Sequence, residues 1–374
     1  MQPRKEFCST EGCPSRGQIG KGNIIIHDSS RRLYQCKLCK NTFSETKHTM
    51  FHGLKTPKDT VILVITLLTF GCPKVAISRA FGFDIRTIDS WITKAGLHCE
   101  GIHNHLVVQP KHHEQVQADE LQAKCQGFRP DSYRDWMALA ISVPSRLWLG
   151  GVISKRRTKN LIRQLLEMVA ACCITNQALL LVTDGLRTYA SVAAKCFTTP
   201  VLTGKKGRPR LQLWNNFVLM QCVKSYHRNG KRWICKGVHR VVCSLKNTTV
   251  NTLKITTILR NTQGQAKFVN TAYIERLNAS FRSGISALMR RSRYTLKSIE
   301  KLHQWMYLYG TVYNFCTVHK SLKTTPALKA GITQKVWSIQ DLLLYKVPVQ
   351  KWKPPKKRGR MSNTVKELIK IWLN

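Results

Sequence analysis

The segment "ALLLVTDG" (178–185) decides the fold that the sequence predicts. An apolar run that ends in a polar residue and a glycine is typical of a short strand buried inside a sheet. The preceding segment, "TKNLIRQLLEMVAACC" (158–173), repeats apolar residues every three or four positions, which indicates an amphipathic helix. Together the two segments predict a helix followed by a central strand that ends at Asp184.

Three further strands are predicted upstream of this helix. The segment "EQVQADELQAK" (114–124) alternates as a strand does and carries Asp119, and "DWMALAISV" (135–143) and "LWLGGVIS" (147–154) follow it. Three strands, a helix and a fourth strand are the order of an α/β ribonuclease H-like fold, with a mixed five-stranded sheet and helices on both faces. In that fold the first and fourth strands lie side by side, so we expect Asp119 and Asp184 to face each other at the edge of the sheet.

A third acid follows a long basic segment. Residues 185–273 contain sixteen Lys and Arg and no Asp or Glu, and the next carboxylate is in "NTAYIERLNASFR" (270–282). The apolar spacing of this segment predicts a helix with Glu275 in its first turn and Asn278 and Arg282 on the same face. We expect Glu275 to join the two aspartates, and the sequence leaves a catalytic role for Asn278 open.

Three carboxylates are suited to two-metal chemistry at a phosphodiester. They can hold two Mg²⁺ or Mn²⁺ ions about 3.5 to 4 Å apart, and Arg282 is placed to bind a phosphate. Each acid also has a plain structural interpretation: Asp184 as a turn residue, Asp119 as a surface position, and Glu275 as a charge at a helix N-terminus. Glu120 is the competing neighbour of Asp119, but strand alternation predicts that it points to the opposite face.

The composition predicts a nucleic-acid partner. The 374 residues include 61 Lys and Arg against 19 Asp and Glu, a formal net charge of +42, and 43% apolar residues. Such a charge favours a polyanion. An acidic membrane surface is the rival interpretation, but the basic residues are spread along the chain and the apolar run at 60–72 is too short to span a bilayer. Fourteen cysteines without an apparent signal peptide favour a reducing cytoplasm.

Residues 1–50 resemble a zinc ribbon. Two cysteine pairs, Cys8 with Cys13 and Cys36 with Cys39, flank "NIIIHDSSRRLYQC" (23–36), which predicts two short strands around an Asp-Ser-Ser turn. Four thiolates suit one tetrahedral, structural Zn²⁺. Free buried thiols or a redox CxxC are the alternatives.

Residues 55–98 predict a helix-turn-helix domain. Two apolar sets at helical spacing are separated by Gly82, and the second helix would present its polar residues to the major groove of DNA. These residues are Arg86, Thr87, Ser90 and Lys94. An ordinary helical hairpin in a core is the alternative.

Weaker signals lie in the remaining chain. The loop "TGKKGRPRLQLW" (203–214) offers a minor-groove contact or simply a solvated basic loop, and its basic residues are Lys205, Lys206, Arg208 and Arg210. Five Cys and His between 222 and 243 match no standard zinc spacing and are interpreted as core or strand residues. Roles for His303 and His319 stay open, and 331–374 is interpreted as a basic tail.

The three acids in "QADEL", "LLVTDG" and "NTAYIERLNASFR", with the later "YNFCTVHKSLKTTPA" (313–327), resemble a DDE transposase of a bacterial insertion sequence. The similarity is to the zinc-ribbon subgroup typified by insertion sequence one, in the retroviral integrase superfamily. It implies that Asp119, Asp184 and Glu275 hold the metals of a catalytic domain at 112–330. It also implies that the enzyme, in the nucleoid, binds the terminal inverted repeats of its element, cleaves the DNA and joins it to a target.

The resemblance leaves two other functions open. One is a DNA-binding regulator that lacks catalysis, and the other is a ribonuclease H-type nuclease that cuts without joining, because cutting and joining use the same displacement at phosphorus. A homodimer or larger assembly is expected when two element ends are paired, and no membrane partner is expected.

Overall fold

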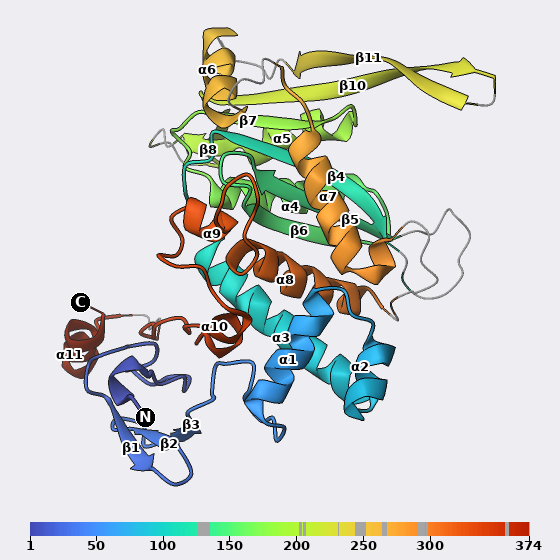
Figure 1. Cartoon of the computed structure of the whole chain (residues 1–374). Helices are drawn as coiled ribbons and strands as arrows, with labels where there is room; N and C mark the ends of the chain where they lie inside the picture. Colours follow the sequence, from blue (N-terminus) through green and yellow to red (C-terminus); the bar gives the residue numbers. More distant parts are fainter. Residues whose placement is uncertain are drawn as a thin grey trace. The chain divides into compact units, whose positions relative to one another are not determined.

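The computed structural model describes residues 1–373 apart from 124, 126–134, 202–203, 205–206, 231, 244–251, 264–267, 290–295, 297 and 356–358, and it leaves undescribed the side chains of 226 and 232–254. The chain forms two compact units (Figure 1). Unit 1 combines residues 1–60 with 343–374, and unit 2 spans residues 61–342. Unit 1 has a small apolar core and unit 2 has a large one.

Unit 1 contains a small antiparallel sheet. A 3₁₀ turn at Pro3–Lys5 precedes the three strands, which are β1 (Ile24–Asp28), β2 (Leu33–Cys36) and β3 (Thr42–Ser44). The turn between β1 and β2 forms because Asp28 Oδ1 accepts hydrogen bonds from Ser30 Oγ at 2.7 Å and from the backbone N–H of Arg31 at 2.9 Å. The predicted hairpin is therefore confirmed, and β3 adds a third strand that the sequence did not indicate.

The C-terminal residues belong to unit 1. Trp352 is buried, Lys346 forms an ion pair with Glu6, and the unit ends in α11 (Asn363–Trp372). Ser362 begins this helix, because its hydroxyl accepts a hydrogen bond from the backbone N–H of Val365 at 3.4 Å. The basic C-terminal segment thus contributes buried and helical residues to the unit that contains the four cysteines.

Unit 2 is organised around a six-stranded mixed sheet with the order β6-β5-β4-β7-β10-β11. The strands are β4 (Gln115–Ala123), β5 (Asp135–Ser142), β6 (Trp148–Ser154), β7 (Leu179–Asp184), β10 (Phe217–Asn229) and β11 (Arg232–Cys243). The pairs β4–β7 and β7–β10 are parallel, and the other neighbours are antiparallel. The first five strands have the order predicted for a ribonuclease H-like sheet, so this fold class is confirmed, and β11 is an additional edge strand.

The register of the two central strands positions the predicted acids. Ala118 of β4 lies opposite Thr183 of β7 in the parallel pairing, so Asp119 and Asp184 are the next residues on neighbouring strands. The strand β7 is buried from Leu179 to Thr183, because it has a partner strand on each side and helices above and below. Its apolar run therefore holds Asp184 at the point where the strand leaves the core.

Helices cover both faces of the sheet (Figure 1). On one face α4 (Lys159–Cys172) packs against β5 and β6 and against α5 (Thr188–Cys196), while α7 (Ala272–Gly284) crosses β4 and β5 on the other. The predicted helix around Glu275 is α7, and it ends at Gly284. A Cβ there would lie 1.9 Å from the ring of Tyr309, so the chain turns at the one residue that permits this approach, and a short 3₁₀ turn (Ser286–Leu288) follows.

The long helix α8 (Ile299–Phe315) is joined to the edge strand β6 by Asn314. Its side-chain Oδ1 accepts a hydrogen bond from Trp148 N at 2.9 Å, and its Nδ2 donates to Trp148 O at 2.8 Å. A glycine at 310 permits this close packing, because a Cβ there would lie 2.3 Å from the indole of Trp148. The short helices α9 (Pro326–Lys329) and α10 (Ile339–Leu344) follow α8.

Three helices precede the sheet: α1 (Lys58–Thr69), α2 (Lys74–Phe81) and α3 (Ile85–Leu106). The last two form the predicted helix-turn-helix, with Gly82 at φ 71° in the turn and Asp84 capping α3. The apolar set predicted for α2 was partly wrong, since only Ile77 is buried there. The helix α3 extends beyond the predicted boundary because its second half packs against α8.

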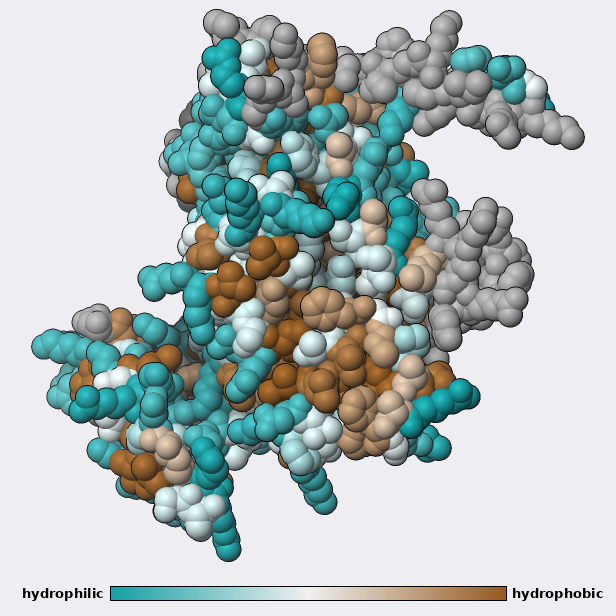
Figure 2. Space-filling view, in the orientation of Figure 1, coloured by the Kyte–Doolittle hydropathy of each residue, from teal (hydrophilic) through white to brown (hydrophobic). Residues whose placement is uncertain are grey.

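Part of the apolar surface near these helices is exposed. Figure 2 shows apolar side chains gathered over α1 and α8. Leu63 of α1 is 47% exposed, and Phe70, which follows α1, is 79% exposed. Within the described residues, no helix combines the length and the apolar character that crossing a bilayer requires. The predicted buried helix at 60–72 is thus α1 of unit 2's helical layer, with one side in the core and the other accessible.

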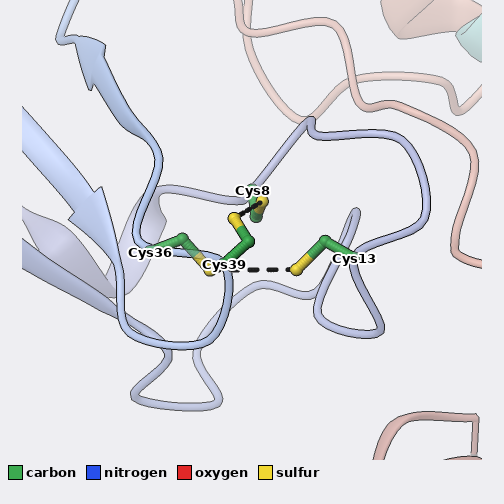
Figure 3. A group of neighbouring side chains, drawn as sticks. All are labelled: Cys8, Cys13, Cys36 and Cys39. Carbon is green, nitrogen blue, oxygen red and sulfur yellow. Dashed lines mark hydrogen bonds between the residues drawn. The ribbon is translucent and has the colours of Figure 1, made fainter.

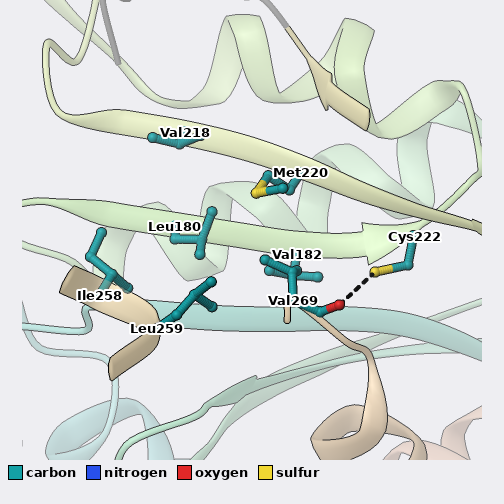
Figure 4. Close-up of a cluster of buried hydrophobic side chains, with 8 residues drawn as sticks. All are labelled: Leu180, Val182, Val218, Met220, Cys222, Ile258, Leu259 and Val269. Carbon is teal, nitrogen blue, oxygen red and sulfur yellow. Dashed lines mark hydrogen bonds between the residues drawn. The ribbon is translucent and has the colours of Figure 1, made fainter. Parts of the chain in front are cut away.

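A cluster of buried apolar side chains joins β7 and β10 to the helix α6 (Thr252–Gln263), as Figure 4 shows. Here α6 packs over β7 and β10, and the Cys222 thiol contacts the backbone oxygen of Val269 at 3.8 Å. A two-stranded sheet of β8 (Thr198–Val201) and β9 (Arg210–Leu213) connects α5 to β10. This cluster holds the first half of β10, up to Cys222, which pairs with Asp184 of β7.

Candidate active site and metal centres

The three predicted acids line one cavity of about 450 Å³. Asp119 comes from β4, Asp184 from the end of β7, and Glu275 from the first turn of α7. The cavity is also lined by Arg157, Gly185, Leu186, Cys222, Val223, Lys224 and Thr271. Residues that are 156 positions apart in the sequence therefore meet because the sheet brings β4 and β7 together and α7 crosses above them.

Asp119 is the most enclosed of the three. Its Oδ2 accepts a hydrogen bond from Asn278 Nδ2 at 2.8 Å, and its Oδ1 accepts one from the backbone N–H of Glu120 at 2.8 Å. Burial and the nearby carboxylates, first Glu120 and then Asp184 and Glu275, raise the pKa of Asp119 to about 7. A proton or a cation is therefore favoured at this carboxylate.

Glu120 and Asp184 share the guanidinium of Arg157. Arg157 Nε and Nη2 lie 3.0 and 2.6 Å from Glu120 Oε2, and Nη2 lies 3.4 Å from Asp184 Oδ2. The guanidinium also lies over the ring of Trp136, 5.0 Å from its centroid. Burial raises the pKa of Glu120 even though Arg157 opposes this shift.

Asp119 and Glu120 are neighbours on β4 and, because side chains alternate along a strand, they have different hydrogen-bond partners. Asp119 bonds to Asn278 of α7, while Glu120 bonds to Arg157 and lies beside the buried Tyr189 of α5, on the other layer of the sheet. Even so, carboxylate oxygens of Asp119, Glu120 and Asp184 all lie within 4.8 Å of one another. The prediction that Glu120 points to the opposite face therefore does not keep its carboxylate away from those of Asp119 and Asp184.

Glu275 is held differently, at the more exposed side of the cavity. Lys224 Nζ lies 3.0 Å from its Oε1, and Thr271 Oγ1 donates to the same oxygen at 2.9 Å. Burial opposes ionisation, but these two hydrogen bonds outweigh it and lower the pKa of Glu275. Among the described residues Glu275 is not within the 4.8 Å group, and it meets the other acids only across the cavity.

The donor set fits a hard divalent cation. Carboxylate oxygens are the ligands that Mg²⁺ and Mn²⁺ prefer, and three such groups border a cavity with room for water or a phosphate. The amide Oδ1 of Asn278 is buried and has no hydrogen-bond partner among the described residues, which leaves one more oxygen beside Asp119. Asp119, Asp184 and Glu275 are therefore suitable metal ligands.

Sequence reasoning missed the basic and hydroxyl partners of these acids. Arg157 and Lys224 sit in segments with several other cations, and nothing local distinguishes them. No pattern in the sequence distinguishes Lys224 from the fifteen other Lys and Arg residues of 185–273. Arg157 and Lys224 lie beside the acids only because the tertiary fold brings their segments to the cavity.

The second candidate centre is the four-cysteine cluster of unit 1 (Figure 3). The Sγ atoms of Cys8 and Cys39 are 3.6 Å apart and those of Cys13 and Cys36 are 4.0 Å apart. Burial raises the pKa of Cys8 to about 12. Burial also acts to raise the pKa of Cys39, but hydrogen bonds with Asn41, Thr10 and the neighbouring thiols together outweigh it and lower that pKa to about 7. Four converging sulfurs, brought together by the hairpin as predicted, fit tetrahedral Zn²⁺.

The other predicted residues lie outside these two centres. Arg86 and Ser90 are exposed on α3, Thr87 and Lys94 are partly buried there, and Arg208 and Arg210 are exposed at β9. Arg282 is partly buried two turns after Glu275, and Lys205 and Lys206 lie outside the described residues. None of the described members of this set lines the carboxylate cavity.

The histidines and cysteines that the sequence left open have other contacts. His303 Nε2 lies 3.0 Å from Glu100 Oε1, between α8 and α3, and His319 Nδ1 lies 3.0 Å from Ser321 Oγ. Cys222 is in the core, His227 is exposed, and the side chains of Cys235, His239 and Cys243 lie outside the described residues. Neither His303 nor His319 is among the described lining residues of the cavity.

Comparison with solved structures gives remote structural similarities, including one to a transposase complex. The chain is similar to the solved cryo-EM structure of a piggyBac transposase synaptic complex with hairpin DNA, with 9% sequence identity and a TM-score of 0.35. The alignment covers 77% of this chain and 70% of that chain. No family model and no curated protein matches the sequence. A similarity of this size leaves the assignment of function to the residues themselves.

Proposed function

We propose that this chain is a metal-dependent DNA transposase that binds the ends of an insertion sequence, cleaves a DNA strand and transfers it to a target. The observation that carries the proposal is the meeting of Asp119, Asp184 and Glu275 at one cavity, from the two central strands and the helix that crosses them. Three carboxylates drawn from separate elements of a ribonuclease H-like sheet suit phosphodiester chemistry.

The charge distribution supports DNA as the substrate. The acid-free segment between Gly185 and Tyr273 includes β10, which passes along the cavity and places Lys224 in its lining. A carboxylate on a surface that follows DNA would repel phosphate, whereas the acids of the cavity lose their repulsion when they bind a cation. A net charge of +42 adds a strong, sequence-independent attraction to the duplex.

The proposed roles of the residues follow from their contacts. Asp119, Asp184 and Glu275 hold the divalent ions, and Asn278 orients Asp119 through its 2.8 Å hydrogen bond. When bound, two ions supply an activated water or 3′ hydroxyl and stabilise the leaving oxygen at phosphorus. Arg282, on the same helix two turns after Glu275, binds a phosphate of the DNA.

The remaining parts are proposed to recognise DNA and to assemble the complex. The four cysteines hold one structural Zn²⁺, and the polar side of α3, with Arg86, Thr87 and Ser90, enters the major groove at an element end. We propose that a zinc ribbon (1–50), a helix-turn-helix (55–98), a catalytic domain (112–330) and a basic segment (331–374) divide these tasks. Pairing of two ends requires at least a dimer during the reaction.

The decisive experiment uses labelled duplexes that carry the DNA flanking the coding sequence, incubated with the full chain and Mg²⁺. The wild type is expected to nick the ends and to join them to a second duplex, whereas Asp184→Asn is expected to bind the same DNA without nicking or joining. A plain nuclease would nick without joined product, and a regulator would bind without either. Equal nicking by Asp184→Asn would remove the catalytic assignment.

A further inference from the structure

Two of the three candidate metal ligands are paired with cations that belong to the chain. Arg157 Nη2 lies 3.4 Å from Asp184 Oδ2, and Lys224 Nζ lies 3.0 Å from Glu275 Oε1. All four residues line the same cavity. Because a cation beside a carboxylate competes with a metal ion for the same oxygen, binding of a divalent ion and these two contacts oppose each other.

The two cations are held by different means. Arg157 is anchored by Glu120, whose side chain is 0% exposed, and it rests on Trp136, while one third of its own side chain remains accessible. Its guanidinium presents five donors, of which Glu120 Oε2 takes only Nε and Nη2. Arg157 therefore can bind a second anion without leaving Glu120.

Lys224 is on the accessible side of the cavity. Its side chain is 41% exposed and that of Glu275 is 52% exposed, so solvent screens their attraction. A flexible ammonium of this kind exchanges one anion for another with little rearrangement. A DNA phosphate that enters the cavity meets this lysine before it meets the buried Asp119.

We propose that Arg157 and Lys224 are exchangeable counter-ions that couple the binding of DNA to the binding of divalent metal. DNA phosphates draw the two cations away from Asp184 and Glu275, and the released carboxylate oxygens then accept the metal ions. By thermodynamic reciprocity, metal binding also frees both cations for the phosphates and strengthens DNA binding. The inference rests on the proposed function, because it assigns a role to the cations of that same cavity.

The cooperativity has a physical benefit for a strongly basic protein. A metal site that stays weak until DNA arrives keeps the phosphate-cleaving chemistry confined to the complex with substrate. The alternative is that the two ion pairs are permanent, and in that case DNA and metal bind independently apart from the general attraction of Mn²⁺ to a polyanion. The two cases differ in how variants of Arg157 and Lys224 respond to DNA.

The test measures Mn²⁺ binding to the full chain by electron paramagnetic resonance of the free ion, with and without a short mixed-sequence DNA duplex. Mn²⁺ bound by the duplex alone is subtracted. In the wild type DNA is expected to raise the Mn²⁺ affinity by about fivefold or more. Lys224→Gln is expected to bind Mn²⁺ more tightly without DNA and to gain less from its addition.

Two further variants separate the pairs from general charge effects. Arg157→Gln alone leaves Glu120 buried without its partner, so Glu120→Gln with Arg157→Gln keeps the charge balance and tests the arginine in a folded protein. This double variant is expected to gain less from DNA than the wild type. Arg156→Gln, which removes an exposed charge next to Arg157, is expected to keep the full gain.

The outcomes distinguish the inference from the function on which it rests. If the wild type gains no more from DNA than Lys224→Gln and the Glu120→Gln/Arg157→Gln variant do, the counter-ion exchange is wrong while the metal site stands. If Asp184→Asn binds Mn²⁺ as tightly as the wild type in every condition, the carboxylates are not ligands, and the proposed function fails with it. A gain that is selectively lost in the two cation variants supports the exchange.

Discussion

The four-cysteine cluster of unit 1 and the carboxylate cavity of unit 2 differ in what their ligand atoms contact. The cysteine sulfurs contact one another, with Sγ pairs at 3.6 and 4.0 Å, and the neutral hydroxyl groups of Ser15 and Thr10. The carboxylates are each bonded to another group of the chain: Asp119 to Asn278, Asp184 to Arg157, and Glu275 to Lys224. The described contacts of the four sulfurs include no cation, so four thiolates need a metal ion to balance their charge, whereas two of the carboxylates already have a cationic partner in the chain.

The sizes of the two cores lead to the same distinction. The apolar cluster of unit 1 is small and includes three of the four cysteines, with Tyr34 as its largest member. Unit 2 has a sheet with helices on both faces and buries most of the apolar residues of the chain. A small core relies on a metal for stability, whereas a large one uses a metal for chemistry.

The largest expected effect is the loss of unit 1 when zinc is removed. Cys36→Ser or treatment with a strong chelator should unfold β1–β3, because a structural Zn²⁺ contributes on the order of 10 kcal/mol to folding. Hydrogen exchange of the amides in 24–44 measures the loss, together with the zinc content of the protein. Cys196→Ser, a cysteine outside the cluster, is the matched control and should retain zinc.

The comparison predicts a different response in unit 2. The same chelator should leave the hydrogen-exchange protection of β4, β5 and β7 intact, since protein donors already hold the carboxylates. Loss of protection in both units at once would contradict the distinction between a metal that folds a unit and a metal that serves its chemistry.

The next effect in size concerns the buried pair of Glu120 and Arg157. Arg157→Leu should destabilise unit 2 by about 3 kcal/mol, because it leaves a carboxylate buried without a cation. Urea unfolding measures the change. Glu120→Gln together with Arg157→Leu should recover most of it, and failure to recover would mean that Arg157 stabilises the fold by packing on Trp136 instead.

The fold of unit 2 was largely predictable from short stretches of sequence. The strands β4 to β7 and the helix α4 between them each carry their own periodicity, and their order alone specifies the sheet. The Cys and His residues of β11 were interpreted as core or strand residues, but the sequence did not indicate that this segment adds a sixth strand at the edge of the sheet. The apolar residues of α2 show a limit of the same method. Helical spacing predicts that they share one side of the helix, but it does not show whether another element covers that side, and only Ile77 of α2 is buried.

The site was predictable in its acids and not in their partners. Asp184 ends a buried strand and Glu275 lies in the first turn of a helix, so local patterns located both residues. Arg157 reaches the cavity from the loop between β6 and α4, and Lys224 reaches it from β10, and only the folded chain defines how these elements lie relative to the acids. For the cysteines the ligands lie within 32 residues around one hairpin, which explains why the whole cluster was predictable.

Lowering the pH is expected to reduce the stability of unit 2 by an intermediate amount, because His103 is buried in its neutral form. This histidine is fully buried between Trp148 and Tyr307, and burial lowers its pKa to about 3. Since the folded pKa lies below the unfolded value of about 6.5, its contribution to stability is complete above pH 6.5 and is lost as the pH falls toward 3. At pH 5 the expected loss is about 2 kcal/mol relative to pH 7.

Urea unfolding of His103→Phe against pH measures this contribution. The variant should lose less stability than the wild type between pH 7 and 5, while His98 and His113, whose pKa values burial lowers to about 4, keep part of the slope. Asp119 acts in the opposite sense, because its pKa of about 7 favours the folded state as the pH falls from 7 to 4. If the pH dependence came from ion pairs and not from His103, the loss of stability would begin near pH 4. The stability curves of the wild type and of His103→Phe would then coincide above pH 4.

The smallest effect on stability and one of the most informative is that of Lys224→Ala. Both Lys224 and Glu275 are about half exposed, so their pair should contribute less than about 1 kcal/mol to folding. Urea unfolding should therefore place Lys224→Ala beside Lys195→Ala, an exposed lysine of α5 that is not in the cavity. In Mn²⁺ titrations, however, the two variants should separate, because only Lys224 competes for Glu275. A change in stability as large as that of Arg157→Leu would show that Lys224 is a structural residue, and a metal affinity equal to that of Lys195→Ala would show that Lys224 does not compete with a metal ion for Glu275.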